Sequence, residues 1–193
     1  MMIFLILLPF GVFSLLMLLT SADLALFASA ATGLAVIVWD AFRGRQIKML
    51  GAGTVVLFLA LGLYLTLVDA TLSNSVIKLT VDIGVLAISL GSLAVRRPFT
   101  LQYAREMVDA ETAGLPGFVK ANHIITWAWT ACMVLMMTGN ILMIYLPGLP
   151  LWSGLAIAFA ARNTAVYFTK WYPEYHRARF ATPPAAAGAL SGS

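Results

Sequence analysis

The chain has 193 residues, of which 61% are hydrophobic and only 10% are charged, and its mean hydropathy is +0.92. Soluble domains carry about 25% charged residues, so this composition excludes a water-soluble fold. The abundance of apolar residues also excludes a disordered chain. The formal net charge is +4, but so few charges do not make a nucleic-acid binder. The single cysteine excludes an internal disulfide and a multi-cysteine metal site. What remains is an all-α, multi-pass membrane protein.

Six stretches are apolar and long enough to cross a bilayer, which requires about 20 residues. They are residues 2–20, 23–39, 49–68, 75–95, 124–146 and 149–170. When the six stretches are taken two at a time in chain order, the turn that joins the two members of each pair is short. We therefore expect three antiparallel hairpins. The first stretch lacks the basic start of a signal peptide and is interpreted as a retained span. We expect residues 1–179 to form one bundle and residues 180–193 a flexible cytoplasmic tail.

The basic residues predict the orientation of these six spans. Ten of the twelve lysines and arginines lie in segments that fall on one side of the membrane: Arg43, Arg45, Lys48, Arg96, Arg97, Arg105, Lys120, Lys170, Arg177 and Arg179. Positive residues stay on the cytoplasmic side. Both termini are therefore predicted to be cytoplasmic, in the inner membrane.

The longest connection, residues 96–123, carries a predicted short helix. Pro98 favours a helix start, and Leu101, Ala104 and Val108 are spaced to share one face. We expect residues 97–109 to lie on the inner membrane surface as an amphipathic helix. It is either a connector whose arginines contact lipid phosphates, or a docking surface or cap over a cytoplasmic vestibule. The candidate residues of this connection are Arg97, Tyr103, Arg105, Glu106, Asn122 and His123.

Three segments carry a resemblance to a known family: RPFTLQYARE at 97–106, KANHIITW at 120–127 and RQIKMLG at 45–51. They resemble a family of small bacterial integral membrane proteins that is distantly similar to the intracellular septation protein A group. The resemblance covers residues 36–130. It implies a bacterial inner-membrane location and a link to envelope synthesis. It implies no reaction, and no catalytic residue is carried over.

Charged residues inside the predicted spans are functional candidates, because each costs about 2.5–3.5 kcal/mol on insertion scales. Lys78 and Asp82 lie four apart on one helical face, so they can pair. Arg162, followed by Asn163, lies near the middle of the last span, and it could meet Asp82 if the fourth and sixth spans pack together. Three interpretations stay open: a buried pair that fixes helix packing, a transport site at the bundle centre, and an arginine that snorkels towards the inner headgroups.

No cofactor is assigned from the sequence. The two histidines, His123 and His176, fall at the predicted cytoplasmic boundary, whereas membrane haems are held by histidines inside a bundle. Cys132 and the methionines that follow it offer soft ligands for Cu(I). Methionine is nevertheless an ordinary apolar filler, and the additional histidine or cysteine pairs of copper pumps are missing.

No catalytic residue is assigned either. Neither Gly-x-Ser-x-Gly nor His-Glu-x-x-His occurs in the chain. An enzyme that acts on a lipid headgroup at the cytoplasmic interface stays open as an alternative. It requires four side chains to converge: Arg105, Glu106, Asp109 and His123.

The sequence therefore predicts a non-catalytic inner-membrane protein, an accessory or envelope-assembly factor. Its expected partners are membrane lipids, other inner-membrane proteins and further copies of itself. The first alternative is a small transporter or channel with a pathway lined by Asp82, Arg162 and Asn163. The lipid-headgroup enzyme is the second alternative.

Overall fold

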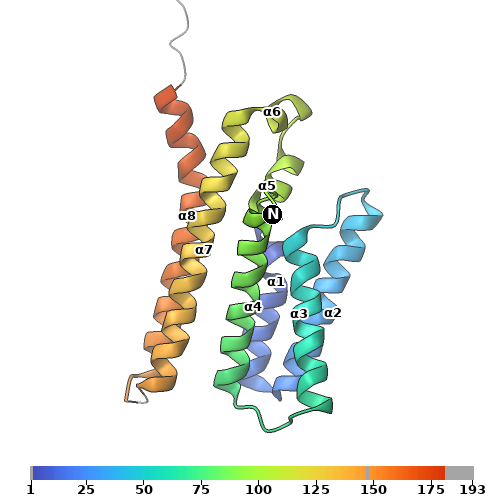
Figure 1. Ribbon diagram of the computed structural model, residues 1–193, viewed down its shortest axis with the longest axis vertical. Coiled ribbons are helices and arrows are strands. Elements are labelled where there is room, and N and C mark those ends of the chain that lie inside the picture. The colour runs from blue at the N-terminus through green and yellow to red at the C-terminus, as the bar shows by residue number, and fades with distance from the viewer. Residues whose placement is uncertain (1, 147, 181–193) are drawn as a thin grey trace, which may run out of the picture.

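The computed structural model describes residues 2–146 and 148–180, which form helices and connections and contain no strand (Figure 1). The elements are α1 (Met2–Leu19), α2 (Ala22–Phe42), α3 (Met49–Leu67), α4 (Asn74–Ala94), α5 (Phe99–Ala104), the 3-10 turn η1 (Arg105–Met107), α6 (Ala110–Gly114), α7 (Pro116–Tyr145) and α8 (Leu151–Phe180). The predicted all-α class is confirmed. Of the predicted tail, residues 181–193 lie outside the described residues.

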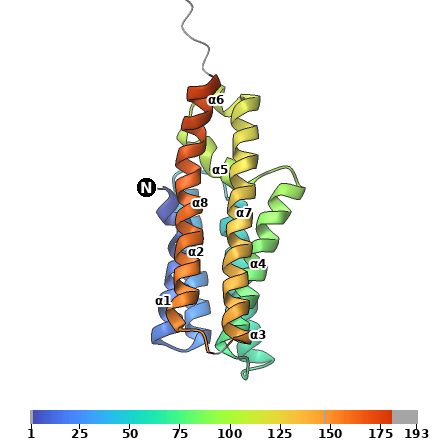
Figure 2. The ribbon, with the colours of Figure 1, turned by 90° about the vertical axis from the view of Figure 1, so that its left-hand side faces the viewer.

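Four of the described helices, α2, α3, α4 and α7, are long and apolar enough to cross a membrane. The apolar stretch Leu8–Leu19 of α1 is shorter. The predicted hairpins are confirmed, because α1 packs against α2, α3 against α4, and α7 against α8. Contacts between α2 and α3 and between α4 and α7 join the hairpins into one bundle (Figures 1 and 2). Helices α5 and α6 lie at the end where α7 begins.

Two helices extend well beyond the predicted spans. Helix α7 begins at Pro116 rather than at residue 124, and proline suits this place because the first helical N–H needs no partner. Helix α8 continues through Pro173 to Phe180 rather than ending at residue 170. Hydropathy marks the apolar part of a helix and not the polar turns that prolong it, which is why both ends were missed.

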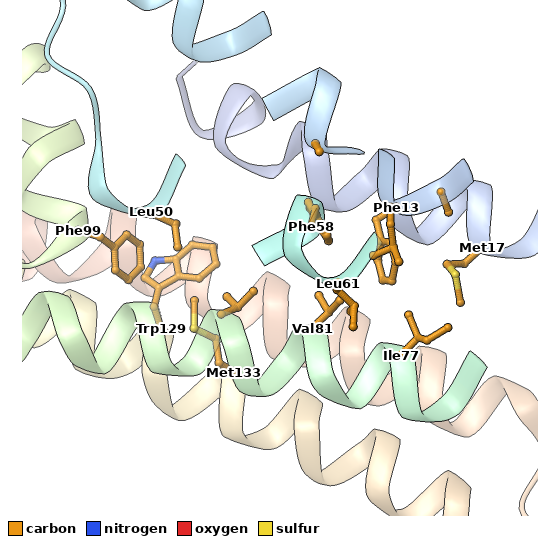
Figure 3. Packing of buried hydrophobic residues seen from close by; sticks show 14 of the residues in the cluster. Phe13, Met17, Leu50, Phe58, Leu61, Ile77, Val81, Phe99, Trp129 and Met133 are labelled. Atoms are coloured by element: carbon orange, nitrogen blue, oxygen red, sulfur yellow. The ribbon is translucent and has the colours of Figure 1, made fainter. Parts of the chain in front are cut away.

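The core runs along the bundle between α1, α3, α4 and α7 (Figure 3). Phe58 of α3 is fully buried, and its ring centroid lies 5.2 Å from that of Phe13 and 5.8 Å from that of Phe10. Nearer α5, the ring of Phe99 meets Trp129 edge-on at 6.5 Å. These contacts fix α1 against α3 and α5 against α7.

Two glycines let α3 approach its neighbours closely. A Cβ atom on Gly33 of α2 would lie 2.8 Å from Val55 Cγ2, and one on Gly84 of α4 would overlap the side chain of Leu57. Small residues at helix crossings serve this purpose in membrane bundles, where van der Waals packing holds the helices together. Helix α3 is therefore seated tightly between α2 and α4.

Candidate functional site

Helix α5 is inserted into the end of the bundle by hydrogen bonds at its first turn. The Phe99 N–H donates to Ser92 Oγ over 3.2 Å, which ties the helix to the end of α4. The Thr100 hydroxyl donates to the Asn122 carbonyl over 2.9 Å and lies 2.6 Å from the Thr126 hydroxyl. Both partners belong to α7. The position of α5 is thus set by two of the candidate spanning helices.

The predicted short helix within residues 97–109 is present, but its bounds and the side that it buries differ from the prediction. The helix begins at Phe99 and ends as η1 at Met107, and Val108 is extended with φ −131° and ψ 163°. Phe99 and Leu101 are buried, so the apolar side of α5 faces protein rather than a lipid surface. The predicted face, with Val108 as its third member, was wrong because the backbone leaves the helical path before that residue.

Four charged side chains next to α5 form a cluster, Asp40, Arg45, Lys48 and Glu106, which we call the charged clamp. Lys48 is buried, with 6% of its side chain exposed, and its Nζ lies 2.6 Å from Asp40 Oδ2 and 3.1 Å from Glu106 Oε1. Arg45 Nη1 lies 3.1 Å from Asp40 Oδ1, and Arg45 Nε lies 3.8 Å from Glu106 Oε2. Two cations thus face two carboxylates, and the clamp joins α2, the connection to α3, and η1.

The end of α2 brings the first two members of the clamp together. Gly44 has a φ of +69°, a left-handed conformation that glycine adopts without strain. The Gly44 N–H donates to the Ala41 carbonyl and the Arg45 N–H to the Asp40 carbonyl, both over 3.0 Å. This glycine cap reverses the chain direction. It returns the Arg45 side chain to the Asp40 carboxylate five residues earlier.

Tyr103 and a small cavity lie beside the clamp. Lys48 Nζ is 5.2 Å from the centroid of the Tyr103 ring, within reach of a cation–π contact. The cavity has a volume of about 40 Å³, and its lining includes Pro9, Ile37, Lys48 and Tyr103. That space holds a few water molecules and is far smaller than the 300–1,000 Å³ of common ligand pockets. Tyr103, one of the predicted loop candidates, therefore lines this cavity, and Glu106, another, belongs to the clamp beside it.

The charges of the clamp are paired with one another. Each carboxylate faces a cation, so the clamp presents little free charge to a substrate. Glu106 Oε2 is buried and accepts no hydrogen bond within the described residues. A water in a polar cavity commonly satisfies such an atom. In the described part of the chain, no three His, Cys, Asp or Glu side chains gather closely enough to hold a metal ion.

Tyr103 should resist deprotonation. Burial raises the pKa of its phenol, and the Asp40 and Glu106 carboxylates raise that pKa further, because each disfavours a second negative charge. Since the folded state prefers the neutral phenol, stability from Tyr103 is present below pH 10, the value of an unperturbed tyrosine, and is lost as the pH rises above it. In an alkaline titration followed by tyrosinate absorbance, wild type and Tyr103→Phe should therefore rise equally near pH 10. A smaller rise in the variant would show that Tyr103 ionises normally.

The predicted pair of Asp82 and Arg162 is wrong. Asp82 instead accepts a hydrogen bond from Asn140 Nδ2 of α7. Arg162 is exposed on α8, and the amide of Asn163, also exposed, donates to the Phe159 carbonyl of its own helix over 2.7 Å. The physical reason is the packing order, because α4 and α8 both pack against α7. Asp82 of α4 therefore contacts Asn140 of α7 and not a residue of α8.

The remaining candidates form no hydrogen bond or ion pair with the charged clamp among the described residues. Lys78 is half-buried one turn from Asp82, and within the described residues it forms no ion pair. Asn122 is buried, and its amide donates to the Phe118 carbonyl over 2.9 Å. His123, beside it, is half-buried at the start of α7.

The four residues required by the headgroup-enzyme alternative do not form one bonded site. Glu106 is held in the charged clamp, and the adjacent Arg105 is exposed, as is Arg97. Asp109 caps α6 by accepting from the Thr112 N–H over 2.7 Å, and this bond holds the pKa of its carboxyl below the usual value. Among the described residues, no hydrogen bond or ion pair joins these side chains to His123.

Sequence reasoning missed four of the six polar partners in the charged clamp and the Asp82–Asn140 pair, because it named only Glu106 and Asp82 as candidates. Arg45 and Lys48 were used only to orient the chain, and Asp40 and Asn140 were not singled out. A signal for the clamp was present, because Asp40 is an acidic residue placed just before a cluster of basic ones at the end of a span. The signal for Asn140 was an amide inside an apolar stretch.

Comparisons of the chain with protein-family models, with curated proteins and with solved structures gave no match. The resemblance of residues 36–130 to the septation protein A group therefore stays a prediction.

Proposed function

We propose that this protein spans a bacterial inner membrane six times and acts without catalysis, as an accessory or envelope-assembly factor. Both termini and the charged clamp lie on the cytoplasmic side. Four helices suit a membrane by length and composition, and α1 and α8 each pack along one of them. The connections rich in arginine and lysine meet at the end that carries α5 (Figure 1), as the positive-inside rule requires of the cytoplasmic end.

The internal pairing of polar side chains carries this proposal. Asp82 is bonded to Asn140, and the hydroxyls of Ser89 and Thr130 lie 2.7 Å apart. Trp129 Nε1 donates to the hydroxyl of Thr169 over 2.9 Å. Such bonds hold membrane helices together. A transporter requires its polar groups to line one shared path, whereas here they bond across helix contacts. The pairing thus favours a rigid bundle that works through its surfaces.

The clamp supports a contact surface at the cytoplasmic end. It holds η1 against the end of α2, and the Met49 N–H donates to Gln102 Oε1 over 2.7 Å, so α5 is held to α3 as well. Met107 and Leu115, which flank α6, are 67% and 51% exposed. A fixed platform with exposed apolar side chains suits a protein or lipid partner. The resemblance to the septation protein A group, with its link to envelope synthesis, agrees with this role.

Site-specific photo-crosslinking in native membranes tests the proposal. A photoreactive residue at Met107 should give a discrete protein adduct, and the same residue at Val68, which is exposed at the opposite end, is the matched control. The adduct should weaken when Lys48→Met releases the clamp. Adducts with lipid alone, or equal adducts from both positions, would contradict a protein-contact role. Solute flux through vesicles containing the purified chain would instead support the transporter alternative.

A further inference from the structure

Helix α4 ends in a cap that carries two adjacent arginines. The Arg96 N–H donates to the Leu93 carbonyl over 3.0 Å, and the Arg97 N–H donates to the Ser92 carbonyl over 2.9 Å. This pair of bonds is the Schellman motif, in which the first residue past the C-cap takes a left-handed conformation. That residue is Arg96, and its φ is +55°. We call Arg96 and Arg97 the α4 cap.

The left-handed arginine is a strained choice for this position. The same motif ends α2, where the left-handed residue is Gly44. Glycine adopts this conformation at no steric cost, whereas a left-handed residue with a Cβ atom stores strain, and such strain gathers at functional positions. Among the described residues other than glycine, Arg96 alone has a positive φ. The strain points to a use for the Arg96 side chain that glycine would not serve.

Both side chains of the α4 cap are free to meet a ligand. Arg96 and Arg97 are exposed, and neither forms an ion pair within the described residues. Arg45 and Lys48, near the same end of the bundle, are instead neutralised by the carboxylates of the charged clamp. The α4 cap thus offers two adjacent positive charges without a counter-charge from the described part of the chain, and its complement is an anion.

Contacts with α7 place the α4 cap at one edge of the apolar layer. Phe99, two residues after the cap, meets the ring of Trp129 edge-on at 6.5 Å, and nearby Trp127 is 57% exposed. From Trp127 to Tyr145, which is 78% exposed, α7 runs about 27 Å at 1.5 Å per residue. The hydrocarbon of a bilayer is about 30 Å thick, and aromatic side chains gather at both of its edges. The cap therefore lies at headgroup level if α4 and α7 cross a membrane.

We propose that the α4 cap binds the phosphate of an anionic phospholipid in the cytoplasmic leaflet. A lipid is favoured over a soluble anion because lipid phosphates are concentrated at the depth of the cap. Arginine suits this ligand because its planar guanidinium offers several donors to phosphate oxygens. The inference rests on the proposed function in one respect, that α4 and α7 cross the membrane, and it adds the chemistry of a lipid partner.

Native mass spectrometry of the full-length chain in detergent tests the proposal, with phosphatidylglycerol and phosphatidylcholine as probes. Wild type should bind the first phosphatidylglycerol about 25-fold more tightly, because each of two basic residues beside an anionic lipid contributes about fivefold. Arg97→Gln should lower the preference to about fivefold by the same reasoning. The matched control is Lys120→Gln, which removes an exposed cation about 10 Å beyond Trp127, where α7 continues past the end of α4 (Figure 1). It should leave the preference unchanged.

The variant Arg96→Gly separates lipid binding from folding. Glycine relieves the strain at this position, so the melting temperature should stay the same or rise. The preference for phosphatidylglycerol should nevertheless fall about fivefold, and Arg96→Lys should keep most of it. A rival explanation is that Arg96 serves the fold by meeting the negative end of the α4 dipole. In that case Arg96→Gly lowers the melting temperature and leaves the lipid preference unchanged, and the proposal is overturned.

Three further results would overturn the proposal. They are equal binding of the two lipids by wild type, an equal loss of preference from Lys120→Gln and Arg97→Gln, and displacement of phosphatidylglycerol by excess inorganic phosphate. The last would assign the α4 cap to a soluble anion. Failure of the proposed function is distinguishable, because it is read from the protein adducts of Met107. Loss of those adducts with a retained lipid preference removes only the proposed function.

Discussion

Replacing Lys48 with methionine is expected to destabilise the protein by about 3–5 kcal/mol, the usual cost of removing one partner from a buried ion pair. The methionine keeps the length of the side chain and removes its charge. Glu106 then retains only the distant Arg45 Nε at 3.8 Å, while Asp40 keeps the closer Arg45 Nη1. The loss therefore arises mainly from a stranded Glu106. Unfolding by denaturing detergent, monitored by tryptophan fluorescence, measures it.

The control for this experiment is Lys120→Met, because Lys120 is exposed at the start of α7. It should change stability by less than about 0.5 kcal/mol. The double variant Lys48→Met/Glu106→Gln should recover part of the loss, since no carboxylate is then stranded at η1. A loss as small as that of Lys120→Met would show that the clamp does not hold α5 in place.

Replacing Asn140 with leucine should cost about 1–3 kcal/mol, because Asp82 loses its hydrogen-bond donor inside the bundle. In a cycle with Asp82→Leu, the coupling between the two positions should be about 1 kcal/mol, within the range measured for side-chain hydrogen bonds in membrane proteins. The cycle of Asp82→Leu with Arg162→Leu is the control. Those losses should add, because the two residues do not touch. Coupling in the control cycle, and none in the first, would reverse the assignment of Asp82's partner.

The helical hairpins could be predicted from the sequence because apolar length and turn residues act locally. Turn residues such as those between Thr20 and Ala22 indicate the end of a helix independently of its tertiary contacts. The start of α7 at Pro116 could not be predicted from hydropathy, because polar residues there remain helical once they leave the apolar layer. For the same reason, hydropathy did not predict that residues 171–180 belong to α8.

The candidate site was predicted only in part, because partners are chosen by packing. The choice of Tyr103, Arg105 and Glu106 as the working residues of the connection depended on residue types within one loop. Arg45 and Lys48, which contact two of these residues, lie more than fifty residues earlier in the chain, and only the packing of the end of α2 against α5 and η1 reveals them. Likewise, helical spacing placed Asp82 on a face but did not show that α7, rather than α8, lies against it.

Cysteine accessibility is the most direct test of the central claim, that six spans place the charged clamp and both termini on the cytoplasmic side. In a Cys132→Ala background, single cysteines at Asn74 and Gly148 probe one end of the bundle and a cysteine at Glu111 probes the other. All three positions are exposed. An impermeant maleimide should label the first two in intact spheroplasts and Glu111→Cys only after permeabilisation. Labelling of Glu111→Cys in intact spheroplasts, with protection of Asn74→Cys and Gly148→Cys, would contradict the account.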